Sequence, residues 1–100
     1  MTLLFDTLNA VKDRNLTKTQ LEDFHSTLCE LRSGIKLELA DVLKAKSLFL
    51  VEKPKEIGET RHKITWQASS LGQREIELKN YVGSVNSAIE GVKTRIYALL

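Results

Sequence analysis

Cysteine, proline and glycine are scarce in this chain of 100 residues, which contains one, one and five of them. The single cysteine, Cys29, excludes a disulfide within the chain, and with only two histidines it leaves too few ligands for a closed zinc site. One proline and five glycines are too few for a loop-rich sandwich or a collagen-like repeat. We therefore expect one small domain over residues 1–100, with no metal and no other cofactor.

The chain also lacks a large charge of one sign and a long hydrophobic run. Fifteen basic against 13 acidic residues give a net charge of only +2, and the apolar fraction of 42% argues against disorder. The longest purely apolar run is Leu48 to Val51, and Asp6 interrupts the apolar cluster near the start. A signal sequence and a membrane span need longer runs, so with free Cys29 we expect a soluble, cytoplasmic protein without a membrane partner.

Apolar residues recur at helical spacing over the first half of the chain. Residues 1–15 have this spacing and predict a short amphipathic helix. Residues 17–51 predict the first long helix, because its apolar residues follow one another in steps of three and four, with one last step of seven. That series consists of Leu21, Phe24, Leu28, Leu31, Ile35, Leu39, Val42 and Phe49. Either Thr17 with Gln20 or Thr19 with Glu22 matches the capping-box pattern at its start.

Residues 52–60 interrupt the helical pattern. Pro54 cannot continue a helix, because it lacks the amide hydrogen and clashes with the preceding turn. Gly58 gives the chain conformational freedom to reverse. This segment therefore predicts a short turn between two antiparallel helices.

Residues 61–100 contain two interleaved seven-residue series, which indicate a second long helix. The positions are Ile64, Leu71, Leu78, Val85, Val92 and Leu99 in one series and Ala68, Glu75, Val82, Ile89 and Ile96 in the other. Ten of these eleven are apolar, which is typical of a coiled coil. The predicted fold is all-α: a short N-terminal helix, then a long antiparallel helical hairpin, coiled-coil-like and oligomeric. Glu75, the exception, either fixes the register or marks a point where the apolar stripe meets solvent.

The apolar residues exceed what one hairpin can bury, so we expect a homo-oligomer or an obligate protein partner. Three small residues four positions apart, Gly83, Ser87 and Gly91, predict a strip where another helix approaches closely; the alternative is a tolerant surface. The predicted partner interface consists of Leu71, Leu78, Val82, Gly83, Val85, Ser87, Ile89, Gly91, Val92 and Ile96.

Catalytic residues are hard to find in the sequence. Glu22, His25 and Cys29 share a helical face, and a Cys–His pair can form a nucleophile or supply two metal ligands. Both are also ordinary helix side chains, and the chain has no Gly-rich phosphate loop. We therefore expect no catalytic site, no cofactor-binding residues, no metal ligands and no small-molecule substrate.

Charge is distributed unevenly along the chain. Residues 44–63 hold six basic and three acidic residues, a net +3, and residues 20–43 hold two and five, a net −3. The opposed charges could align neighbouring subunits. The basic segment could also bind single-stranded DNA or RNA through Lys53, Lys55, Arg61, Lys63 and Trp66, with the alternative of a solvated turn. The predicted function is a non-catalytic scaffold or chaperone-like adaptor acting through helix packing, with nucleic-acid binding as the second hypothesis.

Overall fold

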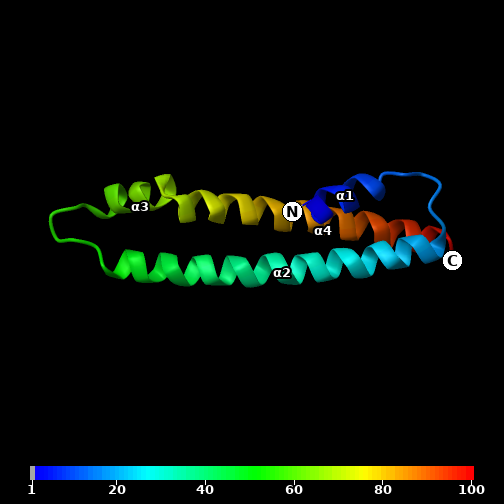
Figure 1. Cartoon of the computed structure of the whole chain (residues 1–100), viewed down its shortest axis with the longest axis horizontal. Helices are drawn as coiled ribbons and strands as arrows, with labels where there is room; N and C mark the ends of the chain where they lie inside the picture. The colour runs from blue at the N-terminus through cyan, green and yellow to red at the C-terminus, as the bar shows by residue number, and fades with distance from the viewer. Residues whose placement is uncertain (1) are drawn as a thin grey trace.

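The computed structural model describes residues 2–100 as four α-helices and no strand, so the all-α prediction is confirmed. The helices are α1 (Thr2–Ala10), α2 (Lys18–Val51), α3 (Glu59–Ala68) and α4 (Ser70–Ala98). The chain reverses after α2, and α4 runs back along it, which makes a rod of 61 × 21 × 17 Å (Figure 1). None of these helices is long and apolar enough to cross a bilayer.

Helix α1 is shorter than the predicted 1–15, of which Met1 lies outside the described residues. The helix ends at Ala10, and residues 11–15 form turns. The guanidinium group of Arg95 donates hydrogen bonds to the backbone carbonyls of Val11 and Asp13. These contacts tie the segment after α1 to α4, and Leu4 is fully buried beneath the helix.

Helix α2 begins with a capping box, and of the two candidate caps the structure has Thr17. The Thr17 hydroxyl accepts a hydrogen bond from the Gln20 amide at 3.2 Å, and the Gln20 side chain accepts one from the Thr17 amide at 2.8 Å. The predicted apolar series is the core face of this helix: Leu21, Leu28, Ile35 and Val42 are buried, and the other four are partly buried.

The predicted continuous helix over 61–100 is wrong, because the chain breaks at Ser69. Ser69 has an extended backbone (φ −74°, ψ 163°) and is both the C-cap of α3 and the N-cap of α4. Its hydroxyl donates to the Trp66 carbonyl at 2.5 Å and accepts from the Gly72 amide at 3.0 Å. One side chain therefore satisfies backbone groups on both sides of the break, which is what an isolated helix end requires.

The break changes which residues of α3 face the core. His62 and Trp66 are buried, whereas the heptad residues Ile64 and Ala68 are exposed. Burying the indole removes far more apolar surface from water than burying Ala68 would. The second half of the heptad pattern is retained in α4, where Leu78, Val85, Ile89 and Val92 are buried.

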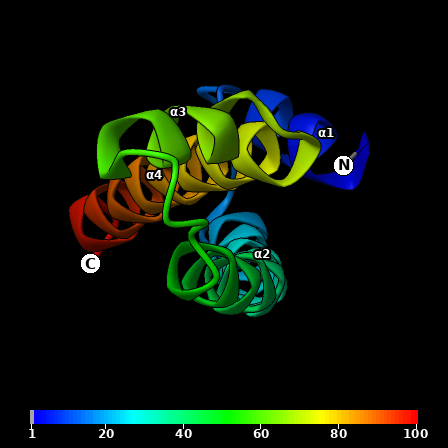
Figure 2. The ribbon, with the colours of Figure 1, turned by 90° about the vertical axis from the view of Figure 1, so that its left-hand side faces the viewer.

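The core is a single layer between α2 and the other helices. Viewed along the rod, α1, α3 and α4 lie on one side of α2, and the opposite side of α2 is bare (Figure 2). Polar side chains also join the long pair: Arg74 donates two hydrogen bonds to Glu38, and Arg32 donates one to Asn86 at 3.1 Å. The hydrogen bonds from Arg74 lower the pKa of the Glu38 carboxyl below its usual value.

Candidate interaction surfaces and the hairpin tip

Four of the ten residues predicted to meet a partner lie in the core of their own chain. Leu78, Val85, Ile89 and Val92 are at most 2% exposed. They pack within the cluster formed by α1, α2 and α4, so they are not accessible to a second molecule. Replacing one of them, such as Ile89, with a charged residue would therefore disrupt this core, and the result would say nothing about an interface. For these four residues the predicted contact with a partner is wrong, because α2, aided by α1, covers the stripe of α4.

The other six predicted residues divide into two groups. Val82 and Ile96 are partly buried against the core, and Leu71 is exposed. The small residues Gly83, Ser87 and Gly91 are exposed on α4, and no atom lies within 4 Å of a Cβ built at either glycine. The strip is therefore open, and none of the described helices packs closely on it.

Twelve large hydrophobic residues are exposed among residues 2–100. They are Leu3, Phe5, Leu37, Leu43, Leu48, Val51, Ile64, Leu71, Ile76, Tyr97, Leu99 and Leu100. On α2, Leu37, Leu48 and Val51 recur at helical spacing on the side opposite the core. The sequence carries this second periodicity, but the stronger series on the core face obscures it.

Glu75 lies at the centre of a buried polar cluster, and the view that it sits at a solvent opening is wrong. Its carboxylate accepts hydrogen bonds from Lys79 at 2.6 Å, from the Trp66 indole at 2.9 Å and from Lys46 at 3.2 Å. The bond from Lys79, supported by those from Trp66 and Lys46, outweighs the burial of the carboxylate and lowers its pKa to about 2. The cluster joins α2, α3 and α4.

Trp66 cannot stack on a nucleic-acid base in this structure, which corrects its predicted role. The side chain is 3% exposed, its ring lies 5.5 Å from that of Phe49, and its indole N–H is occupied by Glu75. Lys55, Arg61 and Lys63 are exposed as a nucleic-acid surface requires, whereas Lys53 is partly buried and donates to the Ile57 carbonyl at 2.9 Å. We call residues 52–63, where the hairpin reverses, the tip. The tip is therefore a basic surface without an accessible aromatic ring on α3.

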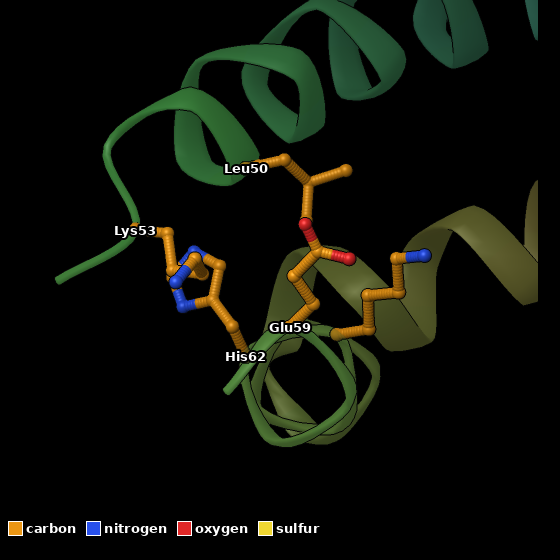
Figure 3. A pocket seen from close by; sticks show the side chains of 5 residues that line it. Leu50, Lys53, Glu59 and His62 are labelled. Carbon is orange, nitrogen blue, oxygen red and sulfur yellow. The ribbon is translucent and has the colours of Figure 1, made fainter. Parts of the chain in front are cut away.

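His62 is a structural residue at the tip that the sequence did not single out. Its ring stacks on Phe49 with centroids 4.0 Å apart, and Nε2–H donates to the Phe49 carbonyl at 2.7 Å. That carbonyl is one of the last four of α2, which have no partner within the helix. His62, Leu50, Lys53 and Glu59 border a hollow of about 170 Å³ (Figure 3), which is smaller than the roughly 300 Å³ at which ligand pockets begin.

His25 and Cys29, which the sequence places on one helical face, lie together on α2. The Cys29 sulfur is 3.9 Å from His25 Nδ1. A hollow of about 350 Å³ between α2 and the end of α4 is bordered by Glu22 and His25 but not by Cys29. Within residues 2–100, no cluster of three or more His, Cys, Asp or Glu side chains could hold a metal ion.

Fold and surfaces together define a class: an all-helical hairpin with a closed core and several uncovered apolar faces. Comparisons with protein-family models, with curated proteins and with solved structures give no match for this chain.

Proposed function

We propose that the protein is a non-catalytic scaffold that acts by packing its helices against those of other subunits, with a homo-oligomer as the working form. One observation carries the proposal: the core is closed within the chain, yet twelve large hydrophobic side chains of the part that the structure describes remain exposed. Scattered exposed leucines are normal, but repeated ones along the bare side of a helix indicate an interaction surface.

The shape of the molecule supports this proposal. Its accessible surface is 6957 Å², against about 5,700 Å² for a monomer of this mass by the usual scaling. Its radius of gyration is 18.2 Å, against about 13 Å for a compact domain of this length. A rod with one thin core layer leaves surface that a second subunit can bury, and this burial stabilises both chains.

The test is the mass in solution, measured by light scattering and sedimentation over a hundredfold range of protein concentration. We expect a multiple of the 11.3 kDa chain mass that falls toward the monomer on dilution. A mass equal to one chain throughout, up to millimolar concentration, would overturn the proposed function.

The second candidate function is binding of single-stranded nucleic acid by the tip. Of the residues described, Lys55, Arg61 and Lys63 are exposed and make no ion pair with a carboxylate, so their charges are available. This function predicts a mobility shift with oligonucleotides that weakens steeply with salt and is lost when Lys55, Arg61 and Lys63 are changed to Gln. Absence of a shift at low salt would dispose of it.

A further inference from the structure

The bare side of α2 carries a heptad pattern of its own. Its residues follow one another in steps of three and four, and all are exposed; we call them the outer face of α2: Gly34, Leu37, Asp41, Lys44, Leu48 and Val51. None of the other helices that the structure describes covers this face, because α1, α3 and α4 all pack on the opposite side of α2 (Figure 2). Leu37, Leu48 and Val51 are 71%, 59% and 84% exposed.

The order of residues along the outer face is self-complementary. Consider a second α2 that runs antiparallel, with a two-fold axis passing midway between Val42 and Leu43. Position 37 then faces position 48 of the other copy, position 41 faces 44, and position 34 faces 51. Leucine therefore meets leucine and aspartate meets lysine, and the two-fold symmetry repeats each pairing.

Neither charge of this pairing is already used within the chain. Asp41 and Lys44 make no ion pair with any described residue. The wider charge distribution along α2 has the same arrangement, since residues 20–43 carry a net −3 and residues 44–51 hold two lysines and no acidic residue. An antiparallel neighbour places each acidic half beside a basic half, whereas a parallel one in register places like charges together.

Gly34 lies at one edge of this face. It borders a hollow of about 290 Å³ that is also lined by Leu3 of α1 and by Ile35 of the core face of α2. No atom lies within 4 Å of a Cβ built at Gly34, so the space above it is open. In the antiparallel pairing, Val51 of the second copy faces Gly34, a projecting side chain opposite an empty position.

We infer that a second copy of this chain packs antiparallel on the outer face of α2, with Leu37 against Leu48 and Asp41 against Lys44 across a two-fold axis. The inference rests on the proposed function and specifies its partner and its interface. It replaces the predicted contact through the heptad residues of α4, which lie in the core.

Charge reversal tests the pairing directly. Asp41→Lys places four lysines at the centre of the interface, and Lys44→Asp places four aspartates there, so each variant alone should raise the dimer dissociation constant at least about tenfold. The double variant restores each pair with its charges exchanged, and it should form a dimer again. An equimolar mixture of the two single variants should form a one-to-one heterodimer, which sedimentation and native mass spectrometry can measure.

Ile76→Glu is the matched control, because Ile76 is a half-exposed apolar residue on α4, away from the outer face of α2. It should leave the dimer intact, and circular dichroism should show unchanged helix content for every variant. Dissociation by the single variants with recovery in the mixture supports the inference. An oligomer that none of the charge variants weakens, or one lost through Ile76→Glu alone, overturns the inference and leaves the proposed function standing. A wild-type chain that is monomeric at all concentrations overturns both.

Discussion

Gly72 has no side chain at the point where α3 and α4 come closest. A Cβ built there would lie 1.8 Å from the Trp66 carbonyl oxygen and 2.7 Å from its carbonyl carbon. Both are backbone atoms. The same carbonyl oxygen accepts a hydrogen bond from the Ser69 hydroxyl, so neither atom can move without disrupting the junction of α3 and α4. The junction therefore requires glycine because two backbones approach closely there. The backbone angle is not the reason, since no glycine in residues 2–100 has a positive φ.

Gly72→Ala should therefore destabilise the protein by about 3 kcal/mol, the upper end of the usual cost of overpacking. Gly83→Ala is the control: Gly83 is also within α4, but nothing lies near its Cβ position. That change should stabilise the helix by up to about 1 kcal/mol. Urea unfolding followed by circular dichroism measures both, and equal effects from the two changes would contradict this account of the junction.

Glu75 makes the stability of the folded chain depend on pH. Its pKa is lowered from 4.5 to about 2 in the folded chain, chiefly by the hydrogen bond from Lys79. The stabilisation from the ionised carboxylate is therefore complete above the unfolded pKa of 4.5 and is lost as pH falls toward 2. The loss amounts to at most about 3 kcal/mol, by the usual conversion of a pKa difference.

The comparison that isolates this effect is Glu75→Gln, which keeps an oxygen for the Trp66 indole but has no charge. The free energy of unfolding of this variant should be lower than that of the wild type at neutral pH. The difference in free energy of unfolding between the two proteins should shrink as pH falls from 4.5 to 2. Unfolding midpoints measured across this pH range would show it. A constant difference over that range would mean that the carboxylate is not held ionised by its partners.

Helix α1 shows how a short element depends on its packing. Nine residues are too few for a stable isolated helix in water. The buried side chain of Leu4 and the hydrogen bonds from Arg95 hold it in place, and Phe5 adds an edge-to-face contact with Tyr81 at 5.8 Å.

The adjacent leucines of α1 provide a matched pair of substitutions. Leu4→Ala should cost about 3 kcal/mol, because Leu4 is fully buried, whereas Leu3→Ala should cost less than about 1 kcal/mol, because Leu3 is 61% exposed. Hydrogen exchange of the α1 amides should also become much faster in Leu4→Ala alone. Similar exchange in the two variants would show that α1 is not anchored through Leu4.

At the scale of elements, the sequence predicted the helices better than it predicted their limits. The spacing from Leu21 to Phe49 identified α2 and its core face, because burial on one side of a helix is recorded directly in the sequence. The break at Ser69 was missed because Ile64, Ala68 and Leu71 continue the heptad pattern without interruption. A tertiary contact overrides that pattern. Trp66 gains a hydrogen-bond partner in Glu75, which lies nine positions away and becomes adjacent only when the chain bends.

The predicted partner interface on α4 was wrong for its buried heptad residues for a similar reason. A heptad stripe shows that residues such as Val85 and Ile89 are buried, but it does not show whether the covering helix belongs to the same chain. The long hairpin supplies that helix itself. The exposed residues on the other side of α2 then become the informative ones, and the pairing that we infer between Asp41 and Lys44 depends on considering the outer face alone.

At the scale of the whole molecule, the thin core leads to a prediction about temperature. A rod that is completed by a second chain unfolds in a reaction that depends on protein concentration, because dilution favours the separated, unfolded chains. A hundredfold increase in concentration should raise Tm by about 5–10 °C for a chain of this size, by mass action and the usual entropy of unfolding. Asp41→Lys should remove most of this dependence, whereas Ile76→Glu should keep it. Circular dichroism melts of the three proteins at two concentrations measure the effect, and a wild-type Tm that does not change with concentration would show that the folded state is complete in one chain.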